Sequence, residues 1–214
     1  MTIPGLRRGQ SGFTLIEMLV VLALMAALMF FSIPAILPVI HQSKLTGIAN
    51  EVKSLMFLAR LNAIKYSTQA VVRIIPVDAT HPIAQVQAFS DRDGDGMLGA
   101  NDTVLASFYL PRGVTFTTPS NLTDAASVSA FSPDPGGAAL PHIAIFRSDG
   151  SLTDNSANCG AGVNCAGAFC LADQNGNYLE VRIPSAATPI PKLFKWDGTN
   201  WRAKGDNKEN WQWN

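Results

Sequence analysis

Four aspartates within twelve residues are the strongest candidates for chemistry in the sequence. They are Asp91, Asp93, Asp95 and Asp102. With Gly96 they fill positions 1, 3, 5, 6 and 12 of an EF-hand calcium loop, and Met97 would supply its backbone carbonyl at position 7. Calcium prefers six to eight oxygen ligands, so the spacing predicts a Ca²⁺ site in a hairpin between strands. The alternative is an Asp/Gly turn without a metal.

Three cysteines lie in one later loop region, at Cys159, Cys165 and Cys170. They follow the apolar N-terminal segment, so we expect them to reach an oxidising compartment where disulfides persist. The spacing does not choose between Cys159–Cys165, Cys159–Cys170 and Cys165–Cys170, and any one of these pairs leaves one thiol over. No histidine lies nearby in the sequence, which argues against a zinc site.

The C-terminal part of the chain combines tryptophans with basic residues. Aromatic faces beside cations can stack nucleic-acid bases and neutralise phosphates. The candidates for DNA contact are Lys192, Lys195, Trp196, Trp201, Arg202 and Lys204. Asp197, Asp206 and Glu209 dilute this charge. The alternative is therefore a terminal strand packed by tryptophans and followed by a polar tail.

The overall composition excludes several classes of protein. The chain has 214 residues, of which 47% are hydrophobic and 15% charged, and 16 basic residues balance 16 acidic ones. This composition argues against a disordered chain and against a protein coated with basic residues. The three histidines are far apart in the sequence, and no nucleophile, metal or phosphate-loop motif is present. We therefore expect that the protein is not an enzyme and that it requires no cofactor.

A long apolar segment near the N-terminus precedes all of these candidate sites in the chain. Residues 18–31 are all apolar, and the apolar stretch extends over residues 13–40, which is long enough to cross a bilayer. A secretory signal peptide is the simpler interpretation, but its apolar core is usually shorter and ends at a small-residue cleavage site. Here the stretch contains Pro34 and Pro38, which we expect to break the helix, and Glu17, which is costly in a membrane.

The rest of the chain predicts an α+β fold. Apolar residues recur every three to four positions in residues 41–69, as in an amphipathic helix. Short β-rich runs with turns between them follow in residues 70–214. The predicted strands are 70–77, 83–90, 103–110, 114–117, 143–147, 168–172, 178–183 and 192–196. We therefore expect one long N-terminal helix packed on an antiparallel β-sheet head.

The segment from Gly12 to Glu17, with Arg7 and Arg8 in a short leader, resembles the class III signal of type IV prepilins and type II secretion pseudopilins. The resemblance implies that a prepilin peptidase removes residues 1–12 by cutting between Gly12 and Phe13, and methylates the Phe13 amine. It implies that residues 13–40 form a membrane and filament-core helix. It also implies that Glu17 guides docking into a growing filament.

The order of segments in residues 40–200 is similar to that of GspH/FimT-type minor pilins and pseudopilins, notably at residues 110–116 and 145–152. This similarity implies a pilin-like fold and a minor pilin that helps to assemble a type IV pilus, with roles in motility, adhesion or DNA uptake. The alternatives are a minor pseudopilin of type II secretion and a DNA-binding minor pilin for natural transformation. The implied partners are other major and minor pilins or pseudopilins, prepilin peptidase, the inner-membrane assembly platform, membrane lipid and DNA. The implied location is the bacterial inner membrane, single-pass with a cytoplasmic N-terminus, and later the pilus, periplasm or cell surface.

Overall fold

The computed structural model describes residues 13–75, 77, 82–117, 119, 143–153 and 167–203, without the side chains of residues 31–38. The chain divides into two compact units, Met1–Ile40 and His41–Asn214. One helix, α1 (Leu15–Tyr66), contributes to both units. The predicted leader, including Gly12, lies outside the described residues.

Helix α1 has 52 residues and continues through both prolines, so the expectation that they break the helix is wrong. A proline removes one backbone donor, but its fixed φ is compatible with a helix, and the flanking turns keep their own hydrogen bonds. The helix ends where Ser67 takes a positive φ of 52°. The Thr68 amide then donates to the Ala63 carbonyl at 3.2 Å, which is the bond that closes a Schellman motif.

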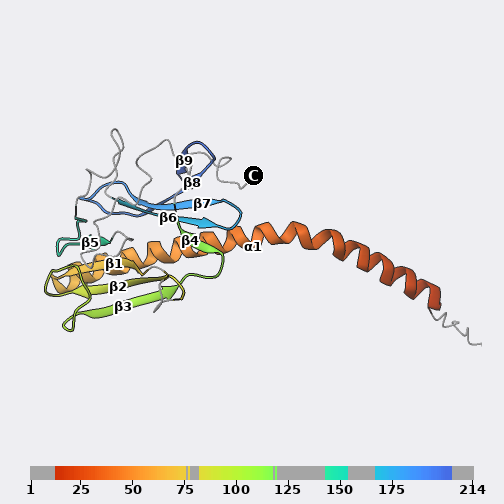
Figure 1. Ribbon diagram of the computed structural model, residues 1–214, viewed down its shortest axis with the longest axis horizontal. Coiled ribbons are helices and arrows are strands. Elements are labelled where there is room, and N and C mark those ends of the chain that lie inside the picture. Colours follow the sequence, from red (N-terminus) through yellow and green to blue (C-terminus); the bar gives the residue numbers. More distant parts are fainter. Residues whose placement is uncertain are drawn as a thin grey trace, which may run out of the picture. The chain divides into compact units, whose positions relative to one another are not determined.

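Two antiparallel sheets follow the helix (Figure 1). The first has the order β3-β2-β1-β5, and the second has the order β4-β6-β7-β8-β9. The strands are β1 (Gln69–Ile75), β2 (Gln85–Asp91), β3 (Thr103–Tyr109), β4 (Val114–Phe116), β5 (Ala144–Phe146), β6 (Gly167–Asp173), β7 (Tyr178–Ile183), β8 (Lys192–Trp196) and β9 (Trp201–Ala203).

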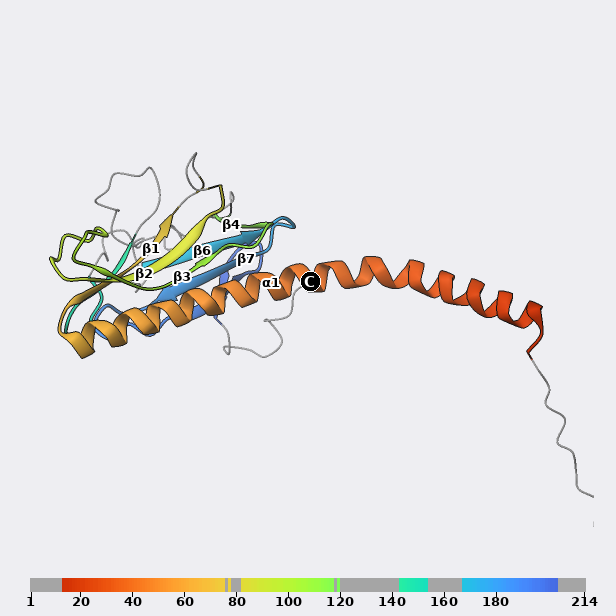
Figure 2. The same ribbon diagram turned by 90° about the horizontal axis from the view of Figure 1, so that it is seen from below.

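The C-terminal half of α1 provides one wall of the main core. Its buried face recurs at helical spacing from Leu45 to Ala63 and belongs to one apolar cluster with residues of both sheets, including Phe146 and Phe169. Figure 2 shows this part of the helix running beneath both sheets. The amphipathic pattern of residues 41–69 therefore buries its apolar stripe against the head, as the sequence predicts.

The predicted fold class is confirmed: a long N-terminal helix precedes antiparallel β-structure. All eight predicted strands are present, with bounds that agree to within two residues. The strands form two sheets where one was expected, and β9 was not predicted.

The first unit carries exposed apolar side chains from Phe13, just before α1, to Phe30 within it. Among the residues that the structure describes, no helix combines the length and apolar character needed to cross a membrane. The membrane span over residues 13–40 stays a prediction from the sequence.

Candidate functional site

The first turn of α1 forms a capping box between Thr14 and Glu17. The Thr14 backbone amide and the Thr14 hydroxyl both donate to Glu17 Oε2, at 3.0 Å and 3.1 Å. In return, the Glu17 amide donates to the Thr14 hydroxyl at 3.3 Å. These bonds satisfy amides that have no partner within the helix, and they are typical of a Ser/Thr-x-x-Glu helix start.

This box holds the carboxylate of Glu17 at the N-terminal end of its own helix, where the helix dipole favours a negative charge. Phe13 directly precedes Thr14 and is exposed, as is Glu17. A chain cut before Phe13 would therefore begin one residue away from the amide that Glu17 binds. The arrangement presents an accessible carboxylate that can bind a cation such as an amine.

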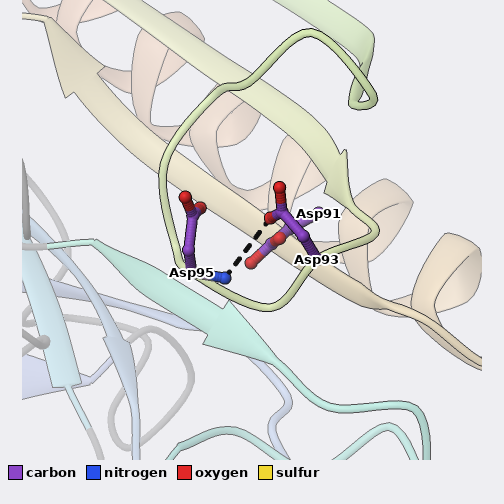
Figure 3. Close-up of side chains that lie close together, drawn as sticks. All are labelled: Asp91, Asp93 and Asp95. Atoms are coloured by element: carbon purple, nitrogen blue, oxygen red, sulfur yellow. Dashed lines mark hydrogen bonds between the residues drawn. The ribbon is translucent and has the colours of Figure 1, made fainter.

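The aspartate loop, residues 91–102, connects β2 to β3. The structure brings together ligand oxygens of Asp91, Asp93 and Asp95, which all lie within 4.8 Å of one another (Figure 3). Asp91 is buried at the end of β2, while Asp93 and Asp95 are exposed. Three of the predicted calcium ligands therefore converge on one side of the loop.

Backbone amides organise the buried carboxylate of Asp91. Gly94 donates to its Oδ1 at 2.7 Å, and Gly96 donates to its Oδ2 at 2.9 Å. Both glycines have positive φ, 77° and 76°, which bends the loop around Asp91. Burial raises the pKa of Asp91 above its usual range, and the neighbouring Asp93 and Asp102 add to this rise, while the two amides oppose it.

Asp102 takes a different place from the one predicted. Asp102 accepts the Arg92 amide on Oδ1 at 2.9 Å and the Gly99 amide on Oδ2 at 2.6 Å, and it is not among the three converging carboxylates. Its side chain closes the loop by bonding the amides of its two arms. Met97 donates its amide to Asp95 Oδ1 at 2.7 Å, and the predicted role of its carbonyl as a ligand stays a prediction.

The basic and aromatic candidates at the C-terminus do not form an exposed array within the described residues. Lys195 and Trp196 are buried, and the Trp196 and Trp201 rings pack at 5.2 Å. Arg202 donates from Nε to Asp197 Oδ2 at 2.7 Å. Lys192 is exposed, and Lys204 lies outside the described residues. Trp196 is thus unavailable for stacking on bases and Lys195 for neutralising phosphates, and DNA binding stays a prediction.

Cys170 is a buried thiol without a disulfide, so neither pairing that includes Cys170 is formed in the structure. Burial and the nearby Glu180 raise its pKa far above the usual range, which makes it a poor nucleophile. Cys159 and Cys165 lie outside the described residues, so a bond between them stays a prediction.

Sequence reasoning missed a buried ion pair on β7. Arg182 donates from Nε and from a terminal nitrogen to the two carboxylate oxygens of Glu180, at 3.0 Å and 2.7 Å. Both side chains are buried, and the Arg182 guanidinium lies 4.5 Å from the centre of the Phe194 ring. Side chains alternate between the two faces of a strand, so Glu180 and Arg182 lie on the same face of β7. Two charged residues on one face indicate a face exposed to solvent, and for this reason the sequence did not predict their burial.

Comparison with known families identifies one segment. Residues 7–33 match the family model of the prokaryotic N-terminal methylation motif. No curated protein and no solved structure matches the chain. The matched residues contain the predicted cleavage site at Gly12–Phe13 and the capping box of Thr14 and Glu17. The match supports a protein of the type IV pilin or pseudopilin kind, and such a signal implies processing by prepilin peptidase, a membrane anchor and assembly with other pilins.

Proposed function

We propose that this pilin-type protein is a minor pilin of the GspH/FimT type that helps to assemble a type IV pilus. In this proposal, residues 13–40 store the subunit as a single-pass protein of the inner membrane, and removal of residues 1–12 frees the Phe13 amine for methylation. The observation that carries the proposal is the methylation motif over residues 7–33, which contains Glu17.

The chemistry of assembly in this proposal is non-covalent. The N-terminal amine of one subunit and the Glu17 carboxylate of a neighbouring subunit would attract one another in an apolar surrounding, where water competes little for either group. The exposed apolar side chains between residues 13 and 30 would exchange lipid for neighbouring helices. The β-rich head would then face outward and present its loops and strand edges.

We also propose that the aspartate loop binds Ca²⁺ in the oxidising compartment. Three convergent carboxylates suit a hard cation that prefers oxygen ligands, and the buried Asp91 would gain most from a neutralising charge. A bound cation would tie the two arms of the loop together and stiffen the connection between β2 and β3. The ion has a structural role here and takes part in no reaction.

The deciding experiment is a deletion strain assayed for twitching motility, protein secretion and DNA uptake. Complementation with the natural gene should restore motility, whereas Glu17→Ala should not. The matched control is Glu51→Ala, which removes an exposed acid from the same helix within the second unit. Restored secretion instead of motility would identify a type II pseudopilin, and restored DNA uptake alone would identify a DNA receptor. Either result would refute the proposed pilus role.

A further inference from the structure

Strand β3 is the longest of the edge strands among those that the structure describes. The sheet orders place β3, β4, β5 and β9 at edges, and β3 has seven residues whereas the other three have three each (Figure 1). β3 bonds to β2 on one side. In the part of the chain that the structure describes, no backbone group pairs with its other side, so a row of amides and carbonyls faces outward.

The sequence of β3 does little to protect this edge. Exposed edges are commonly blunted by charges, prolines or bulges. β3 contains neither a charged residue nor a proline, and its one irregularity is a register shift that leaves Leu105 unpaired with β2. From Ala106 to Tyr109 the pairing with β2 is regular. This stretch can therefore template another strand.

The two faces of β3 differ in character. Ala106 and Phe108 pack against the main core on the helix side of the sheet. Ser107 and Tyr109 alternate with them and are exposed, Tyr109 by 63%. A strand added to this edge would place alternate side chains beside half-buried Phe108 on one face and beside Tyr109 on the other. Both neighbours favour apolar or β-branched residues in the added strand.

Opposite charges flank the two ends of the strand. The aspartate loop, with four acids against the single base Arg92, lies at the beginning of β3. Arg112 is exposed just after its end. A complementary segment would therefore carry a basic residue at the end that meets the loop and an acidic residue at the end that meets Arg112.

We propose that β3 is a docking edge for one extended segment of a partner polypeptide. The segment has an uncharged centre with apolar residues at alternate positions, a base at one end and an acid at the other. Main-chain hydrogen bonds to β3 supply the affinity in this mode of recognition, and the alternate side chains supply the specificity. The inference rests on the head alone and stands whether or not the protein proves to be a minor pilin.

The test uses the head from His41 to Asn214, because both buried clusters lie between Leu45 and Leu193 and need nothing from the first unit. The probe is a labelled peptide with blocked ends, Glu-Thr-Val-Thr-Val-Thr-Val-Thr-Lys, titrated in fluorescence anisotropy. The double variant Ser107→Lys, Tyr109→Lys places charges on the exposed side of the edge and should weaken binding about tenfold or more. Thr115→Lys is the matched control on edge strand β4, and it should leave binding unchanged.

Hydrogen exchange locates the bound peptide independently. Amides of β3 should become protected when the peptide binds, while those of β4 should not change. A second peptide with Glu at both ends should bind the natural head more weakly at low salt. The proposal is overturned if the peptide fails to bind the natural head, if the β3 and β4 variants weaken binding equally, or if protection appears away from β3. Circular dichroism of each variant confirms that a loss of binding is not a loss of folding.

Discussion

Calcium binding by the aspartate loop can be tested through the stability of the head. The perturbation is Asp93→Ala. The Asp95 amide approaches Asp93 Oδ1 at 3.5 Å, which is a weak contact, so the substitution should cost about 0.5 kcal/mol or less without calcium. It removes one of the three convergent carboxylates, so any stabilisation by calcium should largely disappear.

The size of the effect follows from the ligand set. Three convergent carboxylates, with Asp102 turned to backbone amides, place the loop among weak sites with a Kd of about 10⁻⁴ to 10⁻³ M. Calcium at about 10 mM would then stabilise the folded head by about 1.4 to 2.7 kcal/mol. For a domain of this size, that corresponds to a rise in melting temperature of about 3 to 11 °C.

The assay is thermal unfolding of the head, followed by circular dichroism with calcium, with magnesium and with sodium chloride at matched ionic strength. Asp149→Ala is the matched control, because Asp149 is also an exposed acid in a turn, where it accepts the Ser151 amide at 2.8 Å. The natural head and this control should both show the calcium shift. Absence of a shift in the natural head, or a full shift in Asp93→Ala, would refute the reasoning.

Lowering the pH should weaken the stabilisation of the head by calcium. The pKa of Asp91 is raised in the folded head above its usual 3.8, so the folded state binds a proton more readily than the unfolded chain. Without calcium, this group makes the head less stable as pH rises through the window above 3.8. Calcium binds the carboxylate and competes with the proton, so the calcium shift should grow as pH rises through that window. A shift of equal size at acidic and neutral pH would contradict the assignment of Asp91 as a ligand.

Three further predictions concern the N-terminal end of α1 and the buried ion pair on β7. Mass spectrometry of the mature protein should find a chain that begins at Phe13 and is heavier by one methyl group, and any other starting residue would refute processing at Gly12–Phe13. Thr14→Ala should cost about 1 kcal/mol of helix stability and speed amide exchange in the first turn about fivefold, whereas Thr14→Ser should behave as the natural chain does. Glu180→Leu should destabilise the head by about 3 to 5 kcal/mol in denaturant unfolding, because it leaves Arg182 buried without this carboxylate. Replacing both residues by leucine should recover most of that loss, and a double variant as unstable as the single one would show that the pair has another role.

Local patterns in the sequence predicted most of the elements. The bounds of β7 and β8 agree with the prediction because alternating runs end there at turn residues. The register of the sheets depends on contacts between distant segments. β1 pairs with β5 across a long stretch of chain, and β4 pairs with β6 in the second sheet, so the division into two sheets has no local signal.

Burial of the C-terminal candidates depended on the same long-range register. Lys195 pairs with Leu179 of β7, and this places it on the face that also carries Leu193. Trp196 is covered by Trp201 from β9, the strand that the sequence did not predict. When β9 is not predicted, the basic and aromatic residues of this segment indicate an exposed binding surface. In the structure, β9 pairs with β8, and most of these residues pack within the hairpin that the two strands form.

The hydrogen bonds within the aspartate loop distinguish acids that form the turn from an acid that is free for a function, which the composition alone could not do. Asp91 and Asp102 each accept two backbone amides, and Asp95 accepts the Met97 amide, so these three acids have a part in forming the turn. Asp93 accepts one backbone amide, that of Asp95, at the long distance of 3.5 Å, and its side-chain hydrogen bond with Asp91 raises the pKa of Asp91. In a purely structural turn, Asp93 therefore adds little support to the backbone and disfavours the ionised form of Asp91. A cation between the carboxylates would instead stabilise their ionised forms, and for this reason the calcium hypothesis depends on Asp93 more than on the other acids.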